Sequence, residues 1–405
     1  MTFRLALSGL NAAQADLTVT ANNIANTATT GFKNSRAEFA ELFSVSPQGV
    51  SSNAIGNGAR VSNVAQQFTQ GNIDFTDNSL DLALSGQGFF ILNDGGALAY
   101  TRAGAFQVDS QGFVVNARQQ RLQAYPPTTN GQFNTGALSD IQLVTSESAP
   151  AATTAVDVTL NLPANATPPT VAVFDPANVN SYNNATSLTT YDSLGAAHTA
   201  TLYFTKTTNA NEWMTQLYVD GNAVGTQTRL QYDSTGALTD PPNGTITFPG
   251  YTPATGAAQM DMTFDFGTTT QYGGAFNVNA ITQDGYTTGR LIGIDIDSTG
   301  VVQARFTNGR STALGQVALA NFANPQGLQQ LGDTNWAETF GSGQALRGQA
   351  GNSGFGLVQS GALEASNVDI TEQLVNMITA QRNFQANAQM ISTADAITQT
   401  IINIR

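Results

Sequence analysis

The chain has 405 residues, of which 41% are apolar and only 11% charged, with a formal net charge of −13 and no cysteine. Its length allows about two to four domains with real cores, and the lack of cysteine excludes disulfides, thiolate metal sites and cysteine nucleophiles. The negative charge argues against nucleic acid or an anionic membrane as partner, and no apolar run approaches the roughly eighteen residues that span a bilayer.

Residues 1–30 carry the pattern of an amphipathic helix. Apolar residues recur every seven places, at Phe3, Leu10, Leu17 and Ile24. A further apolar residue stands four positions after each of Phe3, Leu17 and Ile24, at Leu7, Ala21 and Ala28. This is the spacing of a coiled-coil seam, and Gly31 after an Asn/Thr cluster is expected to stop the helix.

Residues 34–68 are expected to form an extended arm. Phe39, Leu42 and Phe43 offer apolar anchors, whereas the stretch from Ser44 to Ser62 is rich in Ser, Gly and Asn. That composition is typical of a linker. We therefore expect this segment to pack on neighbours rather than to form a domain.

The middle of the chain has the alternation and turn residues of β-structure. Strand-like runs at 89–92, 112–115 and 291–296 are bounded by Gly, Asn and Asp. The motif Asp-Ser-x-Gly occurs at 109–112, 192–195, 233–236 and 297–300. The Asp can bond the turn backbone while the Gly takes a positive φ, so each motif predicts a hairpin. A calcium loop at 295–306 would need a Glu where Phe306 stands.

Residues 146–280 form a separable unit that is rich in Thr and punctuated by Pro. Strand-like runs lie at 156–160, 200–204 and 260–266. The unit contains ten acidic side chains and only two basic ones. A solvated β domain explains this composition, and its charge favours an outward position in any assembly. His198, the only histidine, is expected at the surface or at a strand edge, since no nucleophile-elbow pattern lies near it.

Residues 363–405 carry a second amphipathic pattern. Its apolar residues follow one another at steps of three or four, at Ile370, Leu374, Met377, Ala380, Phe384, Ala388, Ile391, Ala394, Ile397, Ile401 and Ile404. The mean step of about 3.4 residues is below the 3.6 of a straight helix, which favours a left-handed wrap around a partner.

Both terminal helices have polar faces dominated by Asn, Gln, Thr and Ser, so helix propensity alone cannot hold them. The entropy cost of ordering each segment largely offsets what its apolar stripe returns. We therefore expect the ends to order mainly against other copies of the chain, although two core helices of a globular α+β domain are the alternative. The predicted polymerisation seam comprises Phe3, Leu10, Leu17, Ile24, Ile370, Leu374, Met377, Phe384, Ile391 and Ile401.

Short motifs are spaced along nearly the whole chain. Near the N-terminus they include Asn23-Ile24-Ala25-Asn26 and Gly31-Phe32-Lys33. Others lie at 70–73, 80–84, 86–90, 100–106, 191–195, 308–310, 322–328, 361–369 and 381–387. In this order they resemble the bacterial flagellar family of rod, hook and hook-associated proteins, and the middle of the chain is most similar to the hook members.

The resemblance and the residue patterns together give an α+β fold that is mainly β. We expect a coiled-coil pair of residues 1–30 with 363–405, joined through an arm of 31–71 and 358–362 to a discontinuous inner β domain of 72–145 and 281–357. An outer β domain, 146–280, is inserted into the inner one. The resemblance implies a structural subunit, with no enzymatic activity or cofactor, of a hollow, bendable tube that links rod to filament and transmits torque.

The resemblance also implies partners and a location. Besides further copies of the chain, these partners are the rod protein at the base, the hook-associated junction protein at the tip, the hook cap during assembly and the type III export apparatus. The place would be extracellular, in the flagellar hook, reached without a cleavable signal peptide. A distal rod protein and a secreted adhesin remain alternatives, whereas an enzyme such as a carbohydrate hydrolase would need paired carboxylates in a cleft.

Overall fold

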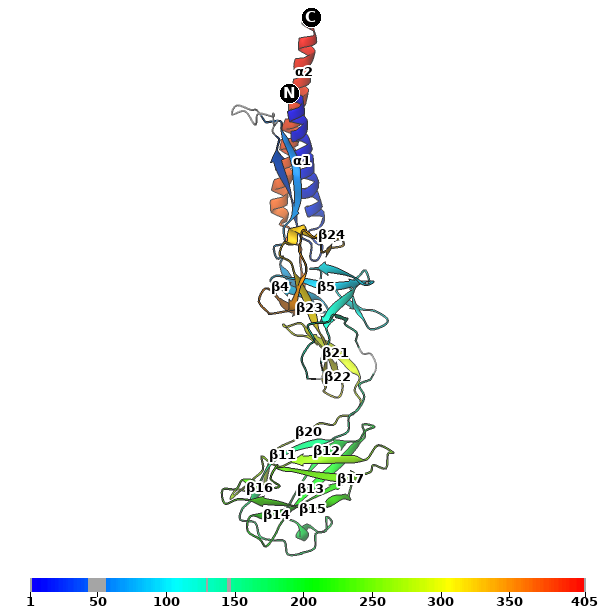
Figure 1. Ribbon diagram of the computed structural model, residues 1–405, viewed down its shortest axis with the longest axis vertical. Coiled ribbons are helices and arrows are strands. Elements are labelled where there is room, and N and C mark those ends of the chain that lie inside the picture. Colours follow the sequence, from blue (N-terminus) through cyan, green and yellow to red (C-terminus); the bar gives the residue numbers. More distant parts are fainter. Residues whose placement is uncertain (1, 43–55, 129, 144–146, 404–405) are drawn as a thin grey trace. The chain divides into compact units, whose positions relative to one another are not determined.

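The computed structural model describes residues 2–42, 56–128, 130–143 and 147–403 (Figure 1). The chain divides into two compact units. The first comprises Met1–Val144, Gly293–Arg305 and Ser311–Arg405, and the second Thr145–Ile292 and Phe306–Arg310. Both terminal segments therefore belong to the first unit. In the part of the chain that is described, neither helix combines the length and hydropathy needed to cross a bilayer.

The two terminal helices are shorter than the sequence pattern predicts. Helix α1 spans Thr2–Ala25 and α2 spans Ile370–Asn403. Helix α2 starts at residue 370, not 363, because the Asp369 carboxylate accepts hydrogen bonds from the backbone N–H groups of Thr371 (2.8 Å) and Glu372 (3.2 Å). Helix α1 ends before Gly31, since the Asn26 side chain turns back to bond the Asn22 carbonyl at 2.9 Å.

The expected arm contains a β-hairpin that its composition did not indicate. Strand β1 (Ser35–Glu41) pairs antiparallel with β2 (Ala59–Gln66). Phe43 and most of the Ser/Gly-rich stretch lie outside the described residues. Two short pairs join the incoming and returning chain, β3 (Ile73–Phe75) with β28 (Ala362–Glu364) and β4 (Leu82–Ser85) with β27 (Leu357–Ser360).

Nearly all the remaining residues in strands of the first unit join in one sheet, whose described pairings are antiparallel and which has a core on each face. The strands of this sheet are β5 (Phe89–Asp94), β6 (Ala97–Thr101), β7 (Gln107–Val108), β8 (Val114–Val115), β9 (Arg121–Tyr125), β10 (Ser139–Asp140), β21 (Leu291–Ile296), β22 (Val301–Phe306), β23 (Ser311–Asn321), β24 (Gln329–Gly332), β25 (Asn335–Ala337) and β26 (Leu346–Gln349). On β5, Phe90 and Leu92 enter one core, whereas Phe89 and Ile91 enter the other with Trp336. The period-2 pattern of a strand buried on both faces explains this division.

The second unit is a sandwich of two five-stranded sheets. One sheet contains β11 (Ala155–Pro163), β17 (Thr245–Tyr251), β18 (Met260–Asp265), β19 (Thr270–Tyr272) and β20 (Asn277–Gln283). The other contains β12 (Asn184–Tyr191), β13 (Ala197–Lys206), β14 (Glu212–Val219), β15 (Asn222–Tyr232) and β16 (Leu238–Asp240). Alternate residues such as Phe204, Trp213 and Phe264 fill the shared core.

All four Asp-Ser-x-Gly turns are confirmed. In each, one oxygen of the Asp carboxylate accepts two backbone N–H bonds, as Asp233 does from Thr235 (2.8 Å) and Ala237 (3.0 Å). The glycines have φ between +78° and +86°, a region that other residues avoid. These turns connect β7 to β8, β12 to β13, β15 to β16 and β21 to β22.

Candidate functional site

The terminal helices pack against each other as an antiparallel pair (Figure 1). At one end Asn23 Nδ2 donates to Gln373 Oε1 at 3.1 Å. Further along, Gly9 lies so close to the Asn387 side chain that a Cβ there would force this side chain to move. Residue numbers therefore rise along α1 as they fall along α2.

Small and polar side chains form the centre of this contact. In α1 the buried positions are Ala6, Ala13, Thr20 and Asn23, and in α2 they are Gln373 and Ala380. The first three repeat every seven residues but lie three places, not four, after Phe3, Leu10 and Leu17. Leu7, Ala21 and Ala28 are exposed in the single chain, so the helix pair itself uses a spacing of three, and the expected spacing of four stays a prediction for contacts between copies. Small residues let two helix backbones approach closely.

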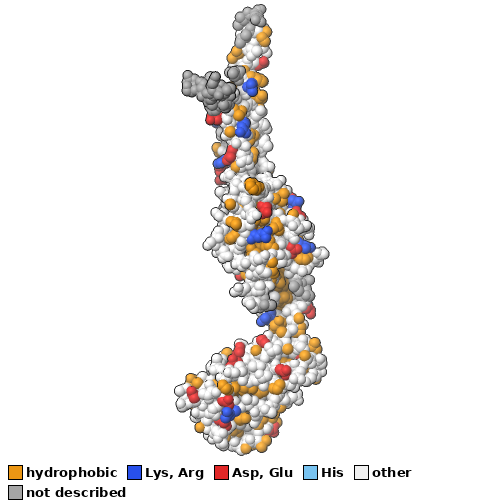
Figure 2. Space-filling view, viewed as in Figure 1, with side chains coloured by type: hydrophobic (Ala, Val, Ile, Leu, Met, Phe, Trp, Pro, Cys, Tyr) orange, Lys and Arg blue, Asp and Glu red, His pale blue; other side chains and the backbone are white. Residues whose placement is uncertain are grey.

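The predicted seam residues divide into two groups in the structure. Half-buried beside the small residues are Leu10, Leu17, Ile24, Met377, Phe384 and Ile391. Exposed are Phe3, Ile370 and Leu374, while the Ile401 side chain lies outside the described residues. Figure 2 shows hydrophobic side chains scattered along the helical pair, on a surface that is otherwise mostly uncharged with a few charged side chains. The pair thus leaves apolar surface that no part of the described chain covers.

Helix α2 also continues past the start of α1 (Figure 1). It has 34 residues against 24 in α1. At the register set by Asn23 with Gln373 and Gly9 with Asn387, residue 2 lies opposite residue 394. Residues 395–403 therefore extend beyond α1, and Ile397 and Ile402 within them are more than half exposed.

The Asn23 side chain, from the Asn-Ile-Ala-Asn motif, ties three elements together. Its Oδ1 accepts from Ser35 N (2.9 Å) and its Nδ2 donates to Ser35 O (2.8 Å), which fixes the start of β1. The same Nδ2 reaches Gln373 of α2. Asn23 is 2% exposed, so these bonds are made away from water, where an unpaired amide would be costly.

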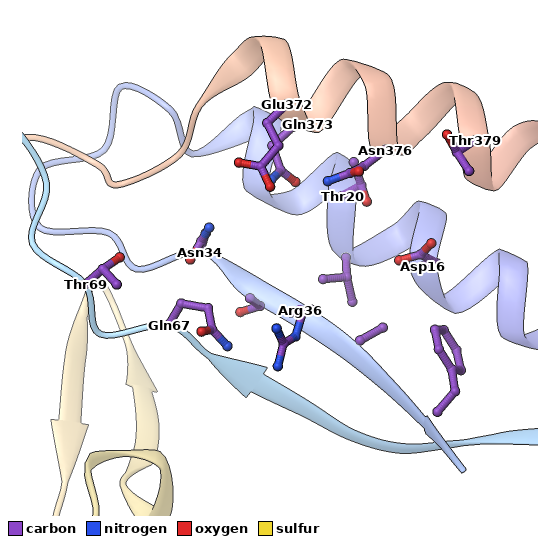
Figure 3. A pocket seen from close by; sticks show the side chains of 14 residues that line it. Asp16, Thr20, Asn34, Arg36, Gln67, Thr69, Glu372, Gln373, Asn376 and Thr379 are labelled. Atoms are coloured by element: carbon purple, nitrogen blue, oxygen red, sulfur yellow. The ribbon is translucent and has the colours of Figure 1, made fainter. Parts of the chain in front are cut away.

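A groove lies between α1, the first turns of α2 and the β1–β2 hairpin (Figure 3). Its volume is about 510 Å³ and its lining is largely polar. The charged side chains that line it are Asp16, Arg36 and Glu372, and burial raises the pKa of Asp16. Among the described residues, no cluster of three or more His, Asp or Glu side chains could hold a metal ion.

The coil joins the inner β-structure through a buried ionic cluster. Glu364 Oε1 lies 2.6 Å from Lys33 Nζ, and Glu364 Oε2 lies 3.2 Å from Arg102 Nη1. All three side chains are at most 5% exposed. Burial lowers the pKa of both Lys33 and Arg102, and the charge and hydrogen bond of Glu364 oppose that shift.

Backbone groups satisfy the rest of this cluster. Lys33 Nζ donates to Thr69 O at 2.7 Å, and Glu364 Oε1 accepts from Gly71 N at 2.9 Å. Gly31 N donates to Glu364 O at 2.8 Å. Gly31 has φ +69°, and a Cβ there would collide with the backbone of Ala103. The motif Gly31-Phe32-Lys33 therefore serves the junction, where the chain leaves α1.

Arg102 and Glu364 lie within the sequence motifs at 100–106 and 361–369, but the sequence alone assigned no role to either residue. A signal was present, because Glu364 is the only charged residue between Arg347 and Asp369, and Lys33 the only one between Asp16 and Arg36. A lone charge in a long uncharged stretch is typical of a buried, paired group. Ala6 and Ala13, the small residues buried between α1 and α2, have no comparable signal in the sequence.

Four family models match successive parts of the chain. They are "Flagella basal body rod protein" at residues 3–33, "Flagellar hook protein FlgE/F/G D1 domain" at 83–173, "Flagellar basal body protein FlaE D2 domain" at 161–286 and "Flagellar basal body rod FlgEFG protein C-terminal" at 359–404. The helix pair and both β units therefore each carry a match.

Relatives match over the full length. The chain is 40% identical over 411 residues to the flagellar hook protein FlgE of Escherichia coli strain K12, with 100% of both chains covered. It is 34% identical over 435 residues to the flagellar hook protein FlgE of Borreliella burgdorferi, with 98% of each covered. The crystal structure of Helicobacter pylori flagellar hook protein FlgE2 shares the fold, with a TM-score of 0.54 at 14% identity over 72% of this chain and 100% of that one.

Replacing Glu364 by Gln is expected to lower the free energy of unfolding of the first unit by about 3–5 kcal/mol, because two buried cations lose their counter-charge. Urea unfolding can be followed by the fluorescence of Trp336, which lies in the core of this unit. Both the reference and the variant would carry Trp213→Phe, so that Trp336 is the only remaining tryptophan.

The matched control is Asp295→Asn. Asp295 pairs with Arg305 at 2.8 Å, but both side chains are more than half exposed. Exposed pairs contribute only about 0–1 kcal/mol. Equal, small losses in the two variants would show that the buried cluster does not hold the junction.

Proposed function

This chain belongs to the family of flagellar hook proteins, and we propose that it polymerises into a hollow, bendable tube whose inner wall is built from the terminal coil. Identical subunits related by a rotation that does not close generate such a helical tube. In the tube the chain would connect rod to filament and pass on the torque of the motor. The family is structural and is not known for catalysis.

The observation that carries the proposal is the uncovered apolar surface of the helix pair. Residues 395–403 have no α1 residues opposite them, yet they present Ile397 and Ile402. At the start of α1, Phe3, Leu5 and Leu7 are exposed as well. Burying each such side chain returns about 1.5–3 kcal/mol, and neighbouring copies offer the same surface in return.

The sequence-derived seam fits this arrangement as a prediction for the assembled state. Leu10, Leu17, Met377, Phe384 and Ile391 are only half-buried within the chain, so each keeps a free flank for a neighbouring helix. We also propose that, in the polymer, the rest of each chain forms the expected connecting arm, the inner β domain and the inserted outer β domain.

The composition of the second unit supports an outward place and sliding contacts. Acidic side chains outnumber basic ones ten to two in residues 146–280, which disfavours crowding near an axis. The face of β12 and β13 that points away from the core exposes Thr189 and Thr199. Polar, wet contacts exchange partners more readily than dry interlocked ones, as bending requires.

Partners and export route follow from the family as proposals. We propose that the rod protein binds the base of the tube, a hook-associated junction protein its tip and a cap its growing end. Export would run unfolded through the flagellar type III apparatus. The lack of cysteine supports this route, because no disulfide has to form on either side of the membrane.

Ile397→Asp is expected to abolish polymerisation while leaving the fold of the free subunit unchanged. The side chain is 55% exposed and lies beyond α1, so the charge meets water in the subunit but an apolar contact in the tube. Electron microscopy and sedimentation of concentrated protein measure assembly, and circular dichroism of dilute protein measures the fold. Ile397→Leu is the control and should form tubes, whereas tubes from the Asp variant would contradict the proposal.

Hydrogen exchange gives an independent test on the unmodified chain. In the dilute subunit the amides of residues 395–403 should exchange faster than those of α2 that lie opposite α1. In the polymer the amides of residues 395–403 should be at least as protected from exchange as those of the part of α2 that lies opposite α1. Equal protection of both parts in the dilute subunit would mean that the end of α2 does not depend on neighbouring copies.

A further inference from the structure

One of the four Asp-Ser-x-Gly turns differs from the others in its second carboxylate oxygen. Asp192 Oδ1 accepts the two turn N–H bonds, from Leu194 and Ala196, both at 2.9 Å. Its Oδ2 lies 3.2 Å from His198 Nε2 and accepts a 2.7 Å bond from Thr255 Oγ1. Asp192 thereby joins its own turn to β13 and to the loop after β17.

A second carboxylate meets the other nitrogen of the same ring. Asp220, which follows β14, places Oδ2 2.6 Å from His198 Nδ1 and anchors Oδ1 on Thr199 N at 2.9 Å. The Tyr251 hydroxyl donates to Asp220 Oδ2 at 3.0 Å, and the Tyr251 ring lies edge-on to His198 with centroids 5.6 Å apart. Two carboxylates therefore bracket one imidazole.

The expectation of a surface or strand-edge position for His198 is wrong. The residue is 6% exposed, and β13 pairs with a strand on each side. The turn of Asp192 and the chain around Tyr251 and Thr255 cover it. Because Asp220, Tyr251 and Thr255 lie more than twenty residues away from His198 in sequence, local pattern could not place them.

The geometry selects the protonated ring. A neutral imidazole has one N–H, so with carboxylate oxygens at both nitrogens one lone pair would oppose another. The imidazolium donates to both. Burial by itself lowers the pKa of His198, but the hydrogen bonds and charges of Asp220 and Asp192 outweigh burial and raise it above its ordinary value of 6.5.

The cluster sits where the chain enters and leaves the second unit. Gly195, in the Asp192 turn, packs so closely on Pro150 and Thr287 that a Cβ would not fit. Pro150 lies in the incoming segment and Thr287 in the outgoing one, and the Ala151–Tyr286 bridge joins these two segments. Thr153 N also donates to Tyr191 O at 2.8 Å. The turn that His198 holds is therefore the turn on which both segments rest.

We propose that His198, Asp192 and Asp220 form a proton-dependent clamp that fastens three loops at this end of the second unit. When the ring loses its proton, Nδ1–H keeps the shorter bond to Asp220, and the bare Nε2 repels Asp192. The Asp192 carboxylate then loses its contact with the His198 ring, while its turn bonds to Leu194 and Ala196 remain. The end of the unit that carries both connecting segments becomes less rigid.

The titratable groups that face His198 are Asp192, Asp220 and Tyr251. Burial opposes ionisation of Asp192, but bonds from Thr255, Ala196 and His198 bring its pKa down to about 2; the pKa of Asp220 is also lowered. The pKa of Tyr251 is raised, so its hydroxyl stays neutral and donating.

The direction of each shift sets the pH window of the clamp. A raised histidine pKa adds stability that is complete below 6.5 and is lost as pH rises through the folded value. The lowered aspartate values add stability that is present above 3.8 and is lost in acid. The clamp is therefore complete in mildly acidic medium and opens towards alkaline pH.

Because His198 is the only histidine, the full chain labelled with 13Cε1-histidine gives a single signal in a heteronuclear NMR titration. The expected midpoint lies above 6.5 in the native protein. Asp220→Asn and Asp192→Asn should each lower it, because each removes one charge facing the ring. Asp233→Asn is the matched control, since Asp233 makes the same turn bonds without a histidine, and it should leave the midpoint unchanged.

A midpoint at or below 6.5 in the native chain would overturn the proposal, as would a midpoint that Asp220→Asn does not lower. The native titration decides the question even if an aspartate variant fails to fold. The thermal unfolding of the second unit gives a further readout through Trp213, which lies in its core, provided that both proteins compared carry Trp336→Phe. The unfolding temperature should be lower at pH 9 than at pH 6 in the protein with His198 and should be the same at both pH values in His198→Gln. A parallel fall in both would also overturn the proposal.

Discussion

The structure of the first unit depends on one buried carboxylate. Glu364 is reached by Lys33 from the end of the N-terminal segment and by Arg102 from the inner β-structure, and it stands five residues before Asp369, which caps α2. Because all three ionic side chains are buried, the cluster tolerates no partial separation: parting any pair would leave a charge without compensation. This constraint fixes where both helices leave the β-structure, and so fixes which faces of the helices can meet.

The helix pair separates folding from assembly by the size of its side chains. Ala6, Ala13 and Ala380 let the two helix backbones approach closely and are buried within the chain. Large side chains such as Phe3, Ile370 and Ile397 stay exposed. A seam of large residues turned inward would bury more apolar area in the subunit but would leave less for neighbours. The arrangement therefore favours a subunit whose helices gain most of their stability on assembly.

Local pattern predicts much of this fold, and non-local contact explains the rest. An apolar run marks β5 and alternating runs mark β13 and β18. The Asp-Ser-x-Gly turns have their chemistry within four residues, so both kinds of element can be predicted from sequence. The β1–β2 hairpin is not, because it depends on Asn23, which lies twelve residues before the strand start that it fixes. The seam offset between Leu7 and Ala6 is equally hidden, since periodicity gives the stripe but not which flank the partner helix takes.

The two buried ionic clusters differ in the kind of cation that each contains. The groups around Glu364 are a lysine and an arginine, and burial lowers the pKa of both while Glu364 opposes that shift. The group around Asp192 and Asp220 is an imidazole with an ordinary value of 6.5. The first cluster joins the terminal coil to the inner β-structure through two cations that share one carboxylate. The second carries, where the connecting segments of the inserted unit meet, a group that titrates near neutrality, so the two fastenings differ in chemistry as well as in place.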